Sequence, residues 1–330
     1  MEELLKNTQA YRLLQKESVE NNCSHAYLLL FDDGRNLRSA LKTFAKILFS
    51  CAEIEDWDED KKDKERIAKL IDEESFSDCL IYPAEGKKLA VEDAESIREE
   101  STLSPIEGER KVFIIGDFAE ANTQTQNKLL KLLEEPPQGV IFLLGATTVF
   151  PVLSTVQSRT KKMEILPFEI TALTDALARI YGNKFDAETL ELCAAASGGI
   201  LGEAQNVLEG GYYKTLLENA FSLCLSEEAR LPSAVRAVGE TKHKKELLSL
   251  LRLIFRDALL WKMQSSGCKK AVLLRSEKDR IEKVATKYTL SALLYAQEAL
   301  SQAEKQVQFN AVFVQCIGLC IANIREKNKK

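Results

Sequence analysis

Short apolar runs alternate with helical patterns over the first 167 residues of the chain. The apolar runs, which we expect to form strands, lie at residues 26–31, 79–82, 111–116, 140–145 and 161–166. Helical patterns stand between them at about 38–51 and 91–100, and again from residue 122 or 123 to the Pro136-Pro137 pair, where a helix must stop. This alternation predicts an α/β fold, a five-stranded parallel sheet with crossover helices.

Strand patterns disappear after residue 167. Residues 168–209 show short helical patterns interrupted by the Gly198-Gly199 pair, and the remainder is helical, with long apolar stretches at 247–263 and 290–324. A chain of 330 residues has room for two or three domains. We therefore expect an α/β domain at 1–167, a small helical domain at 168–209 and a C-terminal all-α domain at 210–330.

The composition is that of a globular protein. Apolar residues make up 45% of the chain and charged residues 29%. The longest wholly apolar runs, 26–31 and 140–144, are far shorter than the roughly 20 residues that a membrane-spanning helix needs. The N-terminal segment MEELLKNTQ lacks the apolar core of a signal peptide. We expect a cytoplasmic chain with no membrane contact.

The cysteines and histidines do not form a metal-binding pattern. The eight cysteines include no pair separated by two residues, and the two histidines, His25 and His243, are far apart. Cys316 and Cys320 are four residues apart on an apolar helical face, which is typical of core packing. We expect reduced thiols and no bound metal.

Charge is unevenly distributed around a net charge of −5. Residues 51–78 form an acidic insert with twelve Asp or Glu and five Lys or Arg, a local net charge of −7. Residues 240–330 hold eighteen Lys or Arg and nine Asp or Glu, a local net charge of +9. This basic third could face a polyanion. Its bases are scattered among acids, however, which favours the interpretation as solvated helix faces.

The turn after the first strand is the place to test for a nucleotide site. A phosphate loop reads G-x-x-x-x-G-K-[ST], because its glycines let backbone N–H groups surround the phosphates and its Lys adds positive charge. Here residues 32–38 read DDGRNLR. Asp32 and Asp33 stand where a polyphosphate needs donors, and each like-charge contact at about 4 Å costs on the order of 4 kcal/mol. We expect a degenerate site around Asp32, Asp33 and Gly34 and no cofactor.

The end of the third strand supplies the other element of an ATP site. Hydrolysing enzymes carry Asp-Glu there, to hold Mg²⁺ and to orient water. This chain has Asp117 followed by Phe118. A single Asp after a strand is also an ordinary cap of a turn or helix, and that interpretation is favoured because the phosphate loop is missing.

Residues 111–168 resemble the most characteristic stretch of clamp-loader subunits of the AAA+ family. The matching parts are an apolar strand that ends in Asp, NKLLKLLEEPP at 127–137, an apolar strand that ends in Thr, and SRT at 158–160, which is similar to the S-R-C element. Weaker likeness lies in SHAYL at 24–28 and LAVEDAESIR at 89–98. The resemblance covers about half of the chain and implies an AAA+-type α/β domain, a helical lid domain and a C-terminal collar domain that joins subunits.

Within this family the chain resembles the non-hydrolysing delta-prime type of bacterial DNA polymerase III subunit. The phosphate loop is missing, and Gly202 stands where an ATPase would carry its second-sensor Arg. There are two departures from the family pattern. Only Cys51 remains of the usual four-cysteine zinc module, so zinc should be absent, and Thr160 replaces the Cys of S-R-C, which leaves the arginine in place.

The resemblance assigns the chemistry to one arginine. In this family the S-R-C arginine reaches the γ-phosphate of ATP in a neighbouring subunit, where it can neutralise charge in the transition state. Carried over, Arg159 is the in-trans arginine finger and Ser158 positions it. Thr147 or Thr148 takes the first-sensor position with a structural role. The implied partners are gamma/tau and delta subunits, and the complex acts on the sliding clamp and primed DNA.

Two other functions stay open at this point. The chain could be a gamma/tau-type clamp-loader ATPase with a divergent phosphate loop, which micromolar ATP affinity of the isolated chain would reveal. It could also be a DNA-binding protein that acts through the basic C-terminal third, which predicts salt-sensitive binding to duplex DNA.

Overall fold

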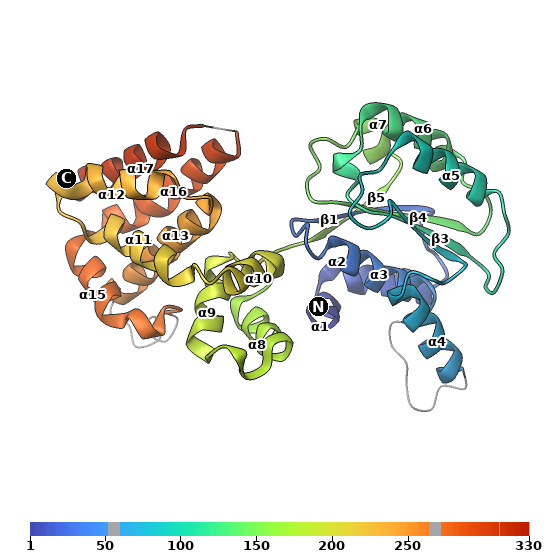
Figure 1. Ribbon diagram of the computed structural model, residues 1–330, viewed down its shortest axis with the longest axis horizontal. Helices are drawn as coiled ribbons and strands as arrows, with labels where there is room; N and C mark the ends of the chain where they lie inside the picture. Colours follow the sequence, from blue (N-terminus) through green and yellow to red (C-terminus); the bar gives the residue numbers. More distant parts are fainter. Residues whose placement is uncertain (52–59, 264–271, 310, 330) are drawn as a thin grey trace. The chain divides into compact units, whose positions relative to one another are not determined.

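The chain forms two compact units, Met1–Pro167 and Phe168–Lys330 (Figure 1). The computed structural model describes residues 1–51, 60–263, 272–309 and 311–329. The boundary between the two units coincides with the place where the sequence loses its strand patterns.

The first unit is built on a five-stranded sheet in the order β2-β3-β4-β1-β5, and every neighbouring pair is parallel. The strands are β1 (Ala26–Phe31), β2 (Cys79–Tyr82), β3 (Lys111–Ile115), β4 (Val140–Ala146) and β5 (Lys161–Ile165). In the central register Tyr27 lies opposite Leu143 of β4 and Lys161 of β5. The predicted strands agree with these bounds to within one residue, and the predicted α/β fold with a five-stranded parallel sheet is confirmed.

Helices cover both faces of this sheet (Figure 1). On one side lie α1 (Glu2–Lys6), α2 (Gln9–Val19), α3 (Leu37–Leu48) and α4 (Lys61–Asp72), and on the other lie α5 (Val91–Ser101), α6 (Thr123–Glu134) and α7 (Ser154–Gln157). A short 3₁₀ turn, η1 (Phe118–Glu120), follows β3. Asn122 caps α6 by accepting the backbone N–H of Thr125 at 2.8 Å, as the sequence predicted.

The central strands are apolar except for Lys111 at the start of β3, because both faces of the sheet are covered. β3 and β4 are buried at every position. Phe113 of β3 and Phe142 of β4 stack with ring centroids 5.5 Å apart in the core below α5 and α6. On the other face α3 approaches β4 so closely that a Cβ at Gly145 would lie 2.6 Å from Leu41 Cδ1. Any larger residue there would force the Leu41 side chain to move.

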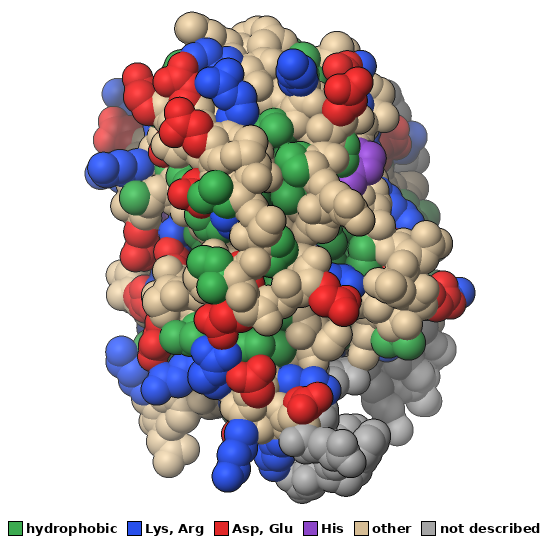
Figure 2. Space-filling view, turned by 90° about the vertical axis from the view of Figure 1, so that its right-hand side faces the viewer, with side chains coloured by type: hydrophobic (Ala, Val, Ile, Leu, Met, Phe, Trp, Pro, Cys, Tyr) green, Lys and Arg blue, Asp and Glu red, His purple; other side chains and the backbone are tan. Residues whose placement is uncertain are grey.

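The acidic insert contains a helix that the sequence analysis did not predict, α4. The helix α4 spans Lys61–Asp72, and residues 52–59 of the insert lie outside the described part of the chain. Arg66 of α4 pairs with Asp63 at 2.9 Å and with Glu107 at 2.5 Å, and Lys46 of α3 pairs with Asp72 at 2.7 Å. Figure 2 shows the two signs of charge intermixed on the face of the first unit that it presents.

The second unit is all helical. It consists of α8 (Ile170–Tyr181), η2 (Gly182–Lys184), α9 (Ala187–Ala196), α10 (Leu201–Gly210), α11 (Tyr213–Leu225), η3 (Glu228–Arg230), α12 (Leu231–Gly239), α13 (Lys244–Lys262), η4 (Arg275–Glu277), α15 (Lys278–Lys287), α16 (Leu290–Gln308) and α17 (Phe313–Lys329). Helix α13 packs against α9, α11, α15 and α16. Ten of its 19 residues are buried, among them Leu247, Leu251, Ile254 and Ala258, as expected of a helix at the centre of a core.

The division of the second unit at residue 209 into lid and collar domains stays a prediction. That position falls at the end of α10. Ala195 and Ala196 of α9 belong to the same hydrophobic core as α13. Among the residues that the structure describes, no helix is both long enough and apolar enough to cross a membrane.

Candidate functional site

The carboxyl ends of β1, β3 and β4 bring Gly34, Asp117 and Thr147 together. Thr147 Oγ1 donates to Asp117 Oδ2 at 3.2 Å, and a Cβ at Gly34 would lie 3.5 Å from Thr147 Cγ2. Burial raises the pKa of Asp117 above its ordinary value. Parallel α/β sheets bind ligands at this edge. The residues expected to form the degenerate nucleotide site therefore lie where a nucleotide site would be.

Asp33 occupies the N-terminus of α3 with its own carboxylate. Its side chain is only 3% exposed, and its Oδ1 accepts the backbone N–H of Asn36, the N-cap of the helix, at 3.1 Å. Its Oδ2 accepts Asn36 Nδ2 at 2.9 Å. A helix N-terminus attracts anions, and in phosphate loops it holds the phosphates. Here the Asp33 carboxylate is bonded to the N-cap residue, just before that N-terminus, while Asp32 is exposed.

Arg38, the nearest cation on α3, is also engaged within the chain. Its Nε donates to Glu74 Oε1 at 2.6 Å and its Nη1 donates to the carbonyl of Pro83 at 2.8 Å. The guanidinium of Arg38, together with the Lys42 ammonium, lowers the pKa of Glu74 to about 2. The hollow beside these groups, which Gly34 and Asp117 also line, measures about 190 Å³. Small-molecule sites usually measure about 300–1,000 Å³.

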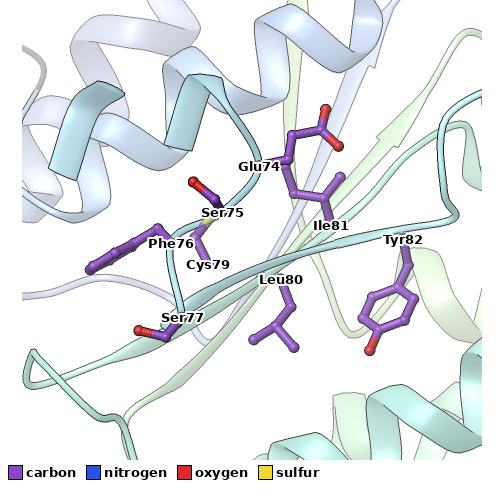
Figure 3. Close-up of a pocket in the computed structure, with 8 residues that line it drawn as sticks. All are labelled: Glu74, Ser75, Phe76, Ser77, Cys79, Leu80, Ile81 and Tyr82. Carbon is purple, nitrogen blue, oxygen red and sulfur yellow. The ribbon is translucent and has the colours of Figure 1, made fainter. Parts of the chain in front are cut away.

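A second hollow, of about 390 Å³, runs along β2 at the free edge of the sheet (Figure 3). Figure 3 shows Leu80 and Tyr82 on one side of the strand and Ile81 on the other. The one charged residue that lines this hollow, Glu74, is already paired with Arg38. The Cys79 thiol, which also lines it, stays protonated at neutral pH because burial raises its pKa to about 12. The lining offers no reactive group, so we assign no chemistry to this hollow.

Arg159 lies directly after α7 and is held on the surface of its own unit. Its Nη1 donates to the Thr155 carbonyl at 2.8 Å and to Ser158 Oγ at 3.3 Å, and its Nη2 forms an ion pair with Glu134 at the end of α6. One third of the Arg159 side chain is exposed. Thr160 Oγ1 donates to the Val156 carbonyl at 3.1 Å. The structure thus brings the predicted pair Arg159 and Ser158 together with a carboxylate that the sequence analysis did not connect to them.

Buried Gln126 ties the loop before α7 to α6. Its Nε2 donates to the carbonyls of Ala121 and Pro151, both at 3.0 Å, and its Oε1 accepts the backbone N–H of Leu153 at 2.9 Å. Gln126 is 1% exposed. No sequence signal distinguished this glutamine, because a polar residue next to the NKLLK segment reads as part of the exposed face of a helix. It fixes the path of the chain between Thr147 and Arg159.

The residues that form this site lie in a segment that matches a known protein family. Residues 6–169 match the model of a family described as "DNA polymerase III, delta subunit". Just under half of the chain is therefore similar to this family of DNA polymerase III subunits. This match covers the α/β unit, which contains Asp33, Asp117 and Arg159.

Clamp-loader subunits from several bacteria are similar to this chain. DNA polymerase III subunit gamma of Buchnera aphidicola is 30% identical over 180 residues, which cover 52% of this chain and 49% of that protein. Subunit tau of Bacillus subtilis is 30% identical over 206 residues, which cover 60% of this chain and 35% of that protein. The chain thus spans half or less of the length of these relatives. A gamma subunit-related protein of Thermotoga maritima is 16% identical, with a TM-score of 0.41 and coverage of 96% of this chain and 99% of that chain.

Two further features predicted from the sequence can be placed in the structure. Gly202 is buried near the start of α10. In the ranges that the structure covers, no group of three or more His, Cys, Asp or Glu could hold a metal ion. Cys51, the remnant of the expected zinc module, is buried, and its thiol donates to the Phe49 carbonyl at 3.1 Å.

Proposed function

We propose that the chain is a non-hydrolysing, delta-prime-type subunit of a clamp loader. In this proposal it assembles in the cytoplasm with gamma/tau-type and delta-type subunits and gives Arg159 to ATP held by an ATPase neighbour. The complex then loads the sliding clamp on primed DNA. The match of the α/β unit to a family of DNA polymerase III subunits and the surface position of Arg159 support this proposal.

The observation that carries the proposal is the carboxylate of Asp33 at the N-terminus of α3. A triphosphate bound in this loop would lie against a buried anion. The loop has neither a second glycine nor a Lys with which to compensate. The chain therefore lacks an ATP cradle of its own.

The role of Arg159 follows from what a guanidinium can do for a phosphoryl group. It is planar, always charged and able to donate two parallel hydrogen bonds to phosphate oxygens. In the transition state of ATP hydrolysis it stabilises the charge on the transferred group. On the surface of this subunit it can act only on a nucleotide that another chain holds.

Two measurements test the proposal. The isolated chain should show no micromolar affinity for ATP by calorimetry. In the reconstituted clamp loader, Arg159→Ala should lower clamp- and DNA-stimulated ATP hydrolysis severalfold or more, because arginine fingers contribute about 10³–10⁵ at the site that they serve. Lys162→Ala, which removes a nearby exposed charge, is the matched control and should leave the rate unchanged. Unchanged turnover with Arg159→Ala would refute the finger assignment.

The second candidate is a gamma/tau-type ATPase with a divergent site. The names of the similar gamma and tau subunits and the contact between Asp117 and Thr147 favour it. It predicts ATP hydrolysis by the isolated chain that Asp117→Asn abolishes. ATP binding by the isolated chain would thus replace the first proposal with this one.

Direct DNA binding by the basic third has less support. Within the described part of the second unit, four of the eighteen bases of this third pair with acids: Arg252 with Glu304, Arg256 with Asp257, Arg280 with Glu218 and Lys329 with Glu228. Such pairs reduce the positive field that a polyanion would meet. Salt-sensitive binding of duplex DNA by the isolated chain would support this function.

A further inference from the structure

We propose that Glu134 is a positioning residue that restrains Arg159 within its own subunit until the triphosphate of a neighbour displaces it. This inference rests on the proposed function, since it assumes that Arg159 serves a nucleotide in trans. The restraint would keep the finger disengaged in the idle complex.

The contacts of Arg159 are the first argument. Both of its terminal nitrogens are used inside the chain, Nη2 by Glu134 and Nη1 by the Thr155 carbonyl and Ser158 Oγ. A phosphate bound by two parallel hydrogen bonds would accept them from Nη1 and Nη2 or from Nε and Nη2, so either mode uses Nη2, the nitrogen that pairs with Glu134. A phosphoryl group held in that way therefore competes with Glu134 for Arg159.

The surrounding charges are the second argument. Glu134 is the last residue of α6, so its carboxylate adds to the negative end of the helix dipole. This arrangement attracts the guanidinium but would repel a phosphate brought against it. Engagement therefore requires Arg159 to exchange Glu134 for the phosphate. A triphosphate carries several negative charges, so it can attract the guanidinium of Arg159 more strongly than the single carboxylate of Glu134 does.

The restraint is weak enough to be reversible. The Glu134 side chain is 47% exposed and that of Arg159 is 33% exposed. Ion pairs with this degree of exposure shift an equilibrium by about 1.4- to 5-fold, and salt screens them. The pair can therefore bias the finger toward the idle state without preventing engagement.

The test uses the reconstituted clamp loader with Glu134→Gln, and with Glu135→Gln as a matched control. Both positions are exposed, and both substitutions remove one carboxylate from the end of the same segment. With Glu134→Gln, basal ATP hydrolysis without clamp and DNA should rise about 1.4- to 5-fold, and the stimulated rate should not change. The difference from wild type should shrink as ionic strength rises. Glu135→Gln should match wild type.

A double variant separates this inference from the proposed function. Glu134→Gln combined with Arg159→Ala should be as slow as Arg159→Ala alone, because the restraint acts only through the arginine. If Glu134→Gln leaves the basal rate unchanged or lowers it while Arg159→Ala is defective, the restraint is refuted and the finger stands. If Arg159→Ala has no effect on turnover, the proposed function itself is refuted.

Discussion

Asp33 provides a direct test of how the first helix of the α/β unit begins. Asp33→Ala removes the acceptor of the Asn36 backbone N–H and of Asn36 Nδ2, at a position that is 3% exposed. Each of these two hydrogen bonds to the buried carboxylate contributes about 1 kcal/mol. We therefore expect the free energy of unfolding to fall by about 2 kcal/mol. In a domain of about 150–250 residues this corresponds to a fall in Tm of about 4–8 °C.

The assay is calorimetric melting of the full chain beside the control Asp32→Ala, whose side chain lies on the surface. The control should melt within about 2 °C of wild type, because exposed substitutions usually change stability by less than about 0.5 kcal/mol. Neither variant should alter ATP hydrolysis by the reconstituted complex, and neither should gain ATP affinity, since the loop still lacks its glycine and Lys. If Asp33→Ala has the same Tm as the control Asp32→Ala, Asp33 does not stabilise the start of α3.

The remaining predictions concern two other interactions that hold the α/β unit together. Gln126→Ala should lower the free energy of unfolding by about 2–4 kcal/mol in urea titration, because it leaves two carbonyls and one N–H without their buried partner. Glu74→Gln should cost about 1 kcal/mol at neutral pH, because the carboxylate is paired with Arg38. Since the pKa of Glu74 is lowered to about 2, this stabilisation is full above about pH 4.5 and is lost as the pH falls toward 2, so wild type and variant should converge in acid melts.

The strands could be predicted from the sequence because a parallel strand covered on both faces reads as a continuous apolar run. β1 and β4 show this clearly, since almost every residue in them is buried. The helix α4 gave no such signal. Its sequence KKDKERIAKLID is mostly charged, and Ile71 is its one fully buried residue. The many charged residues indicated an acidic insert but not a helix. Ion pairs within the helix, such as that of Arg66 with Asp63, help to stabilise it.

The candidate site was only partly predictable, and its contacts explain why. The motif located Arg159 and Ser158, but its partner Glu134 lies 25 residues earlier in the chain, and only the packing of α7 beside α6 brings the two together. The sequence DDGRN suggests an exposed turn, yet Asp33 is buried because it bonds to Asn36 two residues beyond Gly34. Sequence spacing did not indicate either tertiary contact.

The difference between these two contacts bears on what the subunit can offer a nucleotide. Opening the Asp33 contact exposes a buried carboxylate and breaks its two hydrogen bonds to Asn36, at a cost of about 2 kcal/mol before any ligand is bound. Opening the contact of Arg159 with Glu134 breaks a partly exposed ion pair, which costs at most about 1 kcal/mol. A triphosphate can therefore recruit the arginine far more easily than the helix N-terminus. That asymmetry favours a subunit that acts on the ATP of a neighbour over one that binds its own.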